Sequence, residues 1–172
     1  TIIINENIHL QPTNEQQAAQ LFTAIENNRT HLAKFLPWVG NMQTVDHLKA
    51  YLKNAAKLNE QKQEASFAIL FNDVAVGRIG LHYINHQNKT GSIGYWLTEP
   101  AQGKGIILQS CKALINDGFQ NLGLHRIEIK VAVDNVKSQA IPVKLNFKKE
   151  GILRQAEFVN HQYHDLILYS ML

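Results

Sequence analysis

Residues 91–108 have the sequence GSIGYWLTEPAQGKGIIL, which is the most informative stretch of the chain about its fold. Its first part, up to Leu97, is rich in residues that favour β-strands. A turn containing Pro100 then leads through Gln102-Gly103-Lys104-Gly105 into apolar residues at helical spacing. The stretch therefore predicts a strand, a tight glycine turn and the start of a helix.

The glycine turn has the chemistry of an anion site. Two close glycines let a backbone approach a ligand without interference from Cβ atoms, and the unpaired amides at a helix start bind phosphate groups. The spacing is neither that of a Walker loop nor that of the dinucleotide fingerprint. Glycines at a helix entry can also be purely structural, so the spacing alone leaves both interpretations open.

The segment Gln102-Gly103-Lys104-Gly105-Ile106-Ile107 resembles the acetyl-CoA-binding motif of the GNAT superfamily of N-acetyltransferases, Q/R-x-x-G-x-G/A. The resemblance implies that backbone amides of these residues hold the pyrophosphate of acetyl-CoA. It also implies that the backbone of Tyr95, Trp96 and Leu97 aligns the pantetheine arm. The last motif position is Ile107 instead of Gly or Ala, and its bulk is expected to narrow the passage beside the pyrophosphate.

Composition limits the functional classes. A chain of 172 residues with 45% hydrophobic content predicts one domain, residues 1–172, with a sizeable core. The net charge of +3 and the pI near 9.0 suit anionic ligands or an acidic protein substrate. The chain has no dense run of Lys and Arg, so nucleic-acid binding is not predicted. One cysteine, Cys111, excludes an internal disulfide, and the absence of a signal-peptide pattern or an apolar span predicts a cytoplasmic protein that does not bind membranes.

The first sixty residues predict one strand followed by helices. Apolar residues alternate from Ile2 to Leu10, and Thr13 with Gln16 forms a capping box for the next helix. A short helical segment spans His31 to Leu36. Thr44 is the predicted N-cap of a longer helix that ends in the polar segment 59–64.

The remainder predicts strands around two helices. Residues 67–71 and 74–81 form a hairpin through Asn72-Asp73, and the helix after the glycine turn ends at Leu122-Gly123. Cys111 lies on the apolar face of that helix and is predicted to be a core residue. A strand at 126–133, a short helix capped by Asn135, and strands at 147–154 and 163–172 follow, with 155–162 as their connection.

This order of elements predicts an α/β fold with a mixed sheet in which the unit from residue 91 to 133 is a parallel crossover. The order matches the GNAT acyl-CoA N-acyltransferase fold over nearly the whole chain. The resemblance implies a mostly antiparallel sheet of about seven strands with flanking helices. It also implies that the central parallel pair splays apart, so that the acyl chain of the cofactor lies in the resulting V.

Two further segments resemble family elements that contain catalytic residues. Asn135-Val136-Lys137-Ser138 is similar to the family's N-x-x-S element, which implies that Asn135 binds the pantetheine arm and that Ser138 protonates the departing thiolate. Without the family, Ser138 is a polar residue in the first turn of a helix. The segment from Glu150 to Asn160 resembles the RimJ/RimL-type branch, which acetylates the N-terminal serine of a ribosomal protein. That branch implies Glu157 as general base on the acceptor amine, whereas Glu157 taken alone reads as a solvated loop carboxylate.

Trp38, after Pro37, resembles an aromatic residue of the family's acceptor-lining loop. An equally supported alternative is that the Trp38 side chain anchors the hydrophobic core. His82 and His86 are four residues apart in a strand and loop, where their side chains do not converge on a metal. No metal site is predicted.

The sequence therefore predicts an acetyl-CoA-dependent N-acetyltransferase that releases coenzyme A and acts by direct transfer in a ternary complex. The acceptor expected from the branch is a protein N-terminus, and relatives of this type suggest a homodimer. Two alternatives stay open. One is acetylation of a small amine such as a polyamine or aminoglycoside, and the other is a non-catalytic module that senses acetyl-CoA.

Overall fold

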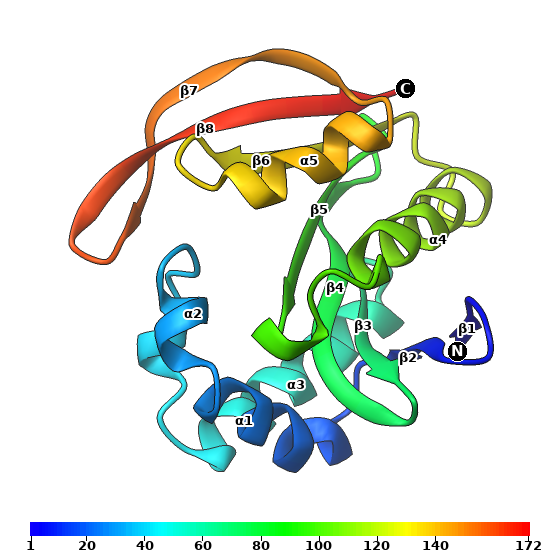
Figure 1. Cartoon of the computed structure of the whole chain (residues 1–172). Helices are drawn as coiled ribbons and strands as arrows, with labels where there is room; N and C mark the ends of the chain where they lie inside the picture. The colour runs from blue at the N-terminus through cyan, green and yellow to red at the C-terminus, as the bar shows by residue number, and fades with distance from the viewer.

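The computed structural model describes residues 1–172 as one mixed sheet with helices on both faces (Figure 1). The helices are α1 (Ala18–Glu26), α2 (Arg29–Ala33), α3 (Val45–Glu60), α4 (Ile106–Gln120) and α5 (Val136–Lys144), with short 3-10 turns at Glu15–Gln17, Val39–Asn41 and Glu99–Ala101. The strands are β1 (Ile2–Ile3), β2 (Ile8–Pro12), β3 (Ala65–Phe71), β4 (Val74–Asn85), β5 (Thr90–Leu97), β6 (Arg126–Ala132), β7 (Lys148–Val159) and β8 (Gln162–Met171).

The sheet has eight strands in the order β1-β2-β3-β4-β5-β6-β8-β7. All neighbours pair antiparallel except β5 and β6, which are parallel because α4 carries the chain back across the sheet between them. The α/β class, the mostly antiparallel sheet and the central parallel pair are confirmed. The expected number of about seven strands becomes eight because the N-terminal segment forms two.

That N-terminal segment was predicted as one strand from Ile2 to Leu10, and this prediction is wrong. The Asn5 side chain accepts hydrogen bonds from the amides of Asn7 and Ile8, both at 2.8 Å, and reverses the chain between β1 and β2. The capping box is also shifted by one residue. Asn14 and Gln17 form it, while Thr13 is buried and its hydroxyl lies 2.9 Å from that of Ser66. A local Asn5 turn therefore decided the first case, and a contact of Thr13 with β3 decided the second.

Other local predictions are confirmed. The Thr44 hydroxyl accepts a hydrogen bond from the His47 amide at 3.1 Å and caps α3. Asn72 and Asp73 turn the β3–β4 hairpin with φ values of 51° and 65°, the left-handed values that a two-residue hairpin turn requires. Cys111 is fully buried on α4, as predicted from the apolar period of that helix.

The core has two parts, one on each face of the sheet. The larger packs α4 against the central strands through residues such as Leu81, Leu114 and Ile127, each fully buried. The smaller packs α1 and α3 against the opposite face through residues such as Leu21 and Leu52. Burial of each such side chain stabilises the fold by about 1.5–3 kcal/mol. No helix is both long and apolar enough to span a bilayer.

Candidate active site

The central feature of the site is the divergence of β5 from β6. Their parallel pairing runs from Thr90 with Arg126 to Ile93 with Ile129 and then stops, although β5 continues to Leu97 and β6 to Ala132. The backbone edges of Trp96 and Leu97 that face β6 are therefore free of sheet partners. This confirms the splayed pair that the family resemblance implied.

A cavity of about 560 Å³ fills the V. Ser92 to Trp96 of β5 and Lys130 to Ala132 of β6 line its two arms. Asn135 and Ser138 reach it from the start of α5, while Glu157 reaches it from β7. Residues from the face of the sheet that α1 and α3 cover complete the lining. These include Trp38, Tyr51, Arg78 and His82. The cavity thus joins the two faces of the sheet at the point where the strands part.

The glycine turn before α4 lies outside the lining of this cavity and forms a separate cradle. Gly103 and Gly105 have φ values of 80° and 73°, which only glycine adopts easily, and nothing lies within 4 Å of a Cβ built on Gly103. The backbone amides from Gly103 to Leu108 donate to no group of the protein, and no side chain caps α4. Six consecutive free donors at the positive end of a 15-residue helix fit a pyrophosphate.

Three side chains of the motif point elsewhere. Ile106 and Ile107 are buried in the larger core, so the expectation that Ile107 narrows the passage is wrong and only its amide serves the cradle. The Gln102 amide nitrogen lies 2.9 Å from Nε2 of His31, which ties the turn to α2. Lys104 is exposed beside the cradle. Apart from Lys104, the motif therefore presents its backbone to the cradle.

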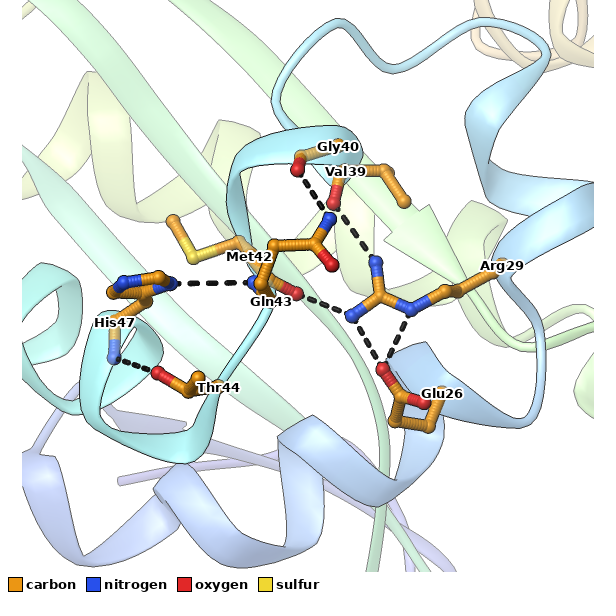
Figure 2. A network of polar contacts seen from close by, with 8 residues as sticks. All are labelled: Glu26, Arg29, Val39, Gly40, Met42, Gln43, Thr44 and His47. Atoms are coloured by element: carbon orange, nitrogen blue, oxygen red, sulfur yellow. Dashed lines mark hydrogen bonds and ion pairs between the residues drawn. The ribbon is translucent and has the colours of Figure 1, made fainter.

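Trp38 lies between the cavity and the smaller core. It lines the cavity and packs against Trp96 with ring centroids 5.9 Å apart, and both rings belong to the smaller core. Figure 2 shows what holds the loop after it: Arg29 donates hydrogen bonds to the carbonyl oxygens of Val39, at 3.0 Å, and Met42. Arg29 is in turn paired with Glu26 of α1. This network fixes the wall of the cavity to α1.

Ser138 lies in the first turn of α5, half-buried at the edge of the cavity. The Asn135 side chain accepts a hydrogen bond from the Ser138 amide at 3.3 Å, so it caps the helix as predicted and orients Ser138. The Tyr95 hydroxyl is buried and has no hydrogen-bond partner in the protein. Ser138 and Cys111 lie close enough to affect its pKa. Burial raises the pKa of Tyr95 well above its usual range and that of Cys111 to about 12, so both stay protonated at neutral pH.

Glu157 was expected in a loop, and this is wrong. Strand β7 continues past a bulge to Val159, Glu157 pairs with His164 of β8, and Asn160-His161 make a tight turn. The strand places the carboxylate at the cavity. Burial raises the pKa of Glu157, and the nearby charge of His164 partly offsets this rise. A carboxyl with a raised pKa is better suited to accept a proton near neutral pH.

Sequence reasoning did not assign Glu64, Arg78, His82, Tyr51 or Tyr83 to the site, yet all five line the cavity. The available signal was glycine inside strands. Gly80 and Gly94 interrupt β4 and β5, and isolated glycines in a strand often mark a close approach of another group. The structure gathers no group of three or more His, Cys, Asp or Glu side chains that could hold a metal.

Residues 7–148 match the model of the acetyltransferase (GNAT) domain family. The chain belongs to this family. It is an N-acetyltransferase, and its sheet with a splayed parallel pair is the GNAT fold. The chain is 35% identical over 170 residues to the ribosomal-protein-serine acetyltransferase of Escherichia coli, covering 99% of this chain and 95% of that protein.

Two solved structures are similar over the whole fold. The ribosomal alpha-N-protein acetyltransferase RimL in complex with coenzyme A superposes with a TM-score of 0.96 at 27% identity, covering 99% of this chain and 97% of that one. The microcin self-immunity acetyltransferase MccE in complex with acetyl-CoA and AMP has a TM-score of 0.93 at 29% identity, covering 98% and 94%. The resemblance stated from sequence motifs is thereby confirmed.

Proposed function

We propose that this N-acetyltransferase transfers the acetyl group of acetyl-CoA directly to the N-terminal amine of a ribosomal protein, with Glu157 as the base and Ser138 as the acid. The observation that carries the reaction is that Ser138, at the start of α5, and Glu157, on β7, line the same cavity. A thiolate leaving on one arm and an amine arriving on the other need these two groups.

The cofactor would be held mainly by backbone. The cradle offers the free amides of residues 103–108 to the pyrophosphate, and the unpaired edge of Trp96 and Leu97 offers hydrogen bonds to the pantetheine. Bound acetyl-CoA supplies an activated thioester. Asn135 and Ser138 lie at the end of this path, where the sulfur would be, and the buried Tyr95 hydroxyl stands beside Ser138 as a second protic group.

Arg78 favours a peptide acceptor over a polyamine. Arg78 is 7% exposed, makes no ion pair, and its Nε is buried without a hydrogen-bond partner. Its Nη2 donates to the Thr13 hydroxyl at 2.9 Å, and its guanidinium lies 5.3 Å from the centre of the Tyr51 ring. A guanidinium that lines the cavity without a carboxylate partner attracts an acceptor oxygen. The main-chain carbonyl beside a protein N-terminus provides one, whereas a polyamine has none.

The charges of the lining point the same way. Its carboxylates are Glu64 and Glu157, and its cations are Arg78 and Lys130, so the wall has no excess of negative charge. Polyamines and aminoglycosides carry several positive charges and require such an excess. One amine with its neighbouring peptide group matches this balance. The overall charge of +3 also suits an acidic protein partner, and we expect the reaction to occur in the cytoplasm, where ribosomal proteins are made.

The test is thiol release from acetyl-CoA with a serine-initiated acidic peptide and, separately, with spermidine. The same peptide with a blocked N-terminus is the control for the acceptor, and Glu157→Gln is the control for the base. Release that requires the free N-terminus and is lost in Glu157→Gln supports the proposal. Release with spermidine alone moves the acceptor to small amines, and acetyl-CoA binding without turnover on either amine favours a sensor.

A further inference from the structure

A second pair of titratable side chains lies at the cavity, away from Glu157. His82 of β4 and Glu64, the residue before β3, approach with Nδ1 and Oε1 3.1 Å apart. Their side chains are 24% and 17% exposed, and both line the cavity. An ionised carboxylate only accepts hydrogen bonds, so the neutral ring carries its hydrogen on Nδ1 and keeps a lone pair on Nε2. No group of the protein bonds to that nitrogen.

Two glycines make room for the ring. A Cβ built on Gly80 would lie 2.8 Å from Nε2 of His82, and one built on Gly94 would lie 3.5 Å from its Cδ2. The imidazole thus packs directly on the backbones of β4 and β5. Gly94 follows Ile93, the last β5 residue that pairs with β6, so the free nitrogen of His82 lies at the apex of the V.

The strand is distorted immediately after His82. The pairing of β4 with β5 shifts between His82 and Asn85, and Tyr83 has a φ of 53°, which is unusual for a bulky residue. Bulges often re-aim a side chain beside an active site. A second, shallow depression lies beyond the bulge, lined in part by Gln63 and His86, and Glu64 and Tyr83 line both it and the main cavity. Glu64 therefore stands between the cavity and an outer surface.

An acceptor amine that enters the site protonated must lose two protons there. The reaction of R–NH3⁺ with acetyl-CoA forms R–NH–acetyl, coenzyme A thiol and one H⁺. The nitrogen forms its bond to the carbonyl carbon while the carbon–sulfur bond breaks, and the nitrogen loses two protons. One proton is balanced by protonation of the sulfur, and the other must leave the site. Glu157 can hold only one of the two.

We propose that His82 accepts one proton of the acceptor amine through Nε2, and that Glu64, as a positioning residue, orients the ring and takes up the Nδ1 proton, which then leaves through the outer depression. Glu157 accepts the other proton. The inference rests on the acetyl transfer proposed above, but not on which amine is the acceptor.

The surroundings of His82 contain both signs of charge. The titratable and charged side chains at the cavity are Tyr51 of α3, Glu64 before β3, Arg78 and Tyr83 of β4, Tyr95 of β5, Lys130 of β6 and Glu157 of β7. Of these side chains, Glu64 is the one in direct contact with the ring.

The experiment measures kcat/KM for His82→Gln across pH, using whichever of the serine-initiated peptide and spermidine the wild-type enzyme acetylates. A failed peptide assignment therefore leaves this test intact. At about pH 7 an N-terminal amine with a pKa near 7.7–8.0 is mostly protonated, and we expect a loss of at least about tenfold. At about pH 9.5 this N-terminal amine is already neutral, and the loss should shrink to about twofold or less. A primary amine of spermidine has a pKa near that of lysine, about 10.4, so with that acceptor the series runs to about pH 11 and the loss should shrink only above about pH 10.

Glu64→Gln keeps a hydrogen-bond acceptor for Nδ1 but removes the charge, so it should show a smaller loss with the same dependence on pH. His125→Gln, which changes an exposed histidine outside the cavity, is the matched control and should match the wild type. Each variant is first shown to bind acetyl-CoA with unchanged affinity. A His82→Gln rate equal to the wild type, or a loss of the same size at every pH, overturns the proposal.

Discussion

Substitution of Gly105 by Ala tests the glycine cradle, and the backbone conformation of Gly105 sets the size of the expected effect. Gly105 has a φ of 73°, and the only atom near an added Cβ is Nε2 of Gln109, at the ordinary contact distance of 3.4 Å. The cost of Gly105→Ala is therefore backbone strain, not a clash. A left-handed conformation costs a residue with a Cβ about 1–2 kcal/mol.

This cost divides between folding and binding. If the turn relaxes in the free enzyme, coenzyme A must restore it, and the full strain weakens binding by about 5–30-fold, since 1.4 kcal/mol is a factor of ten. If the turn holds its shape, the strain lowers the free energy of unfolding instead. The two losses should sum to about 1–2 kcal/mol. Calorimetric titration with coenzyme A and urea unfolding measure them separately.

Gly123→Ala is the matched control. Gly123 follows α4 with a φ of 66° and no atom within 4 Å of an added Cβ, so it carries the same strain far from the free amides. It should lose a similar free energy of unfolding and bind coenzyme A with unchanged affinity. A folded Gly105→Ala enzyme that shows neither a weaker affinity nor a lower stability would refute the left-handed cradle.

Two carboxylates predict opposite changes of stability with pH, both measurable by thermal unfolding at a series of pH values. The raised pKa of Glu157 means that its contribution is fully present below its unfolded pKa and is lost as pH rises through the folded value. Glu157→Gln should therefore gain stability relative to the wild type at pH 8 but not at pH 4, and equal differences at both would contradict the burial of this carboxyl. Hydrogen bonds from Arg126, and then from Ser170, hold the pKa of Glu150 at about 2. The contribution of Glu150 to stability is present above its unfolded pKa and is lost as pH falls toward about 2. Glu150→Gln should therefore be less stable than the wild type at pH 7, and the two should become equally stable in acid. A stability difference that persists at pH 2 would show that the ion pair is not its source.

Local sequence predicted those parts of the site that depend on neighbours along the chain. The glycine turn, the Thr44 and Asn135 caps and the Asn72-Asp73 hairpin each act within about four residues. Ile107 shows the limit of this reasoning. A motif position says which amide is available, but only packing shows that the side chain turns into the core.

What the sequence alone determined is the order of elements, the backbone cradle and the family, because these follow from periodicity, glycine conformation and motif spacing. The tertiary structure decided how the active-site side chains meet. Glu157 reaches the cavity only because β7 bulges and continues along β8. Glu64 and His82 are 18 residues apart, yet they meet above Gly80 and Gly94 of neighbouring strands. Contacts between side chains of different segments depend on how those segments pack in the whole sheet, which the pattern of one segment does not specify.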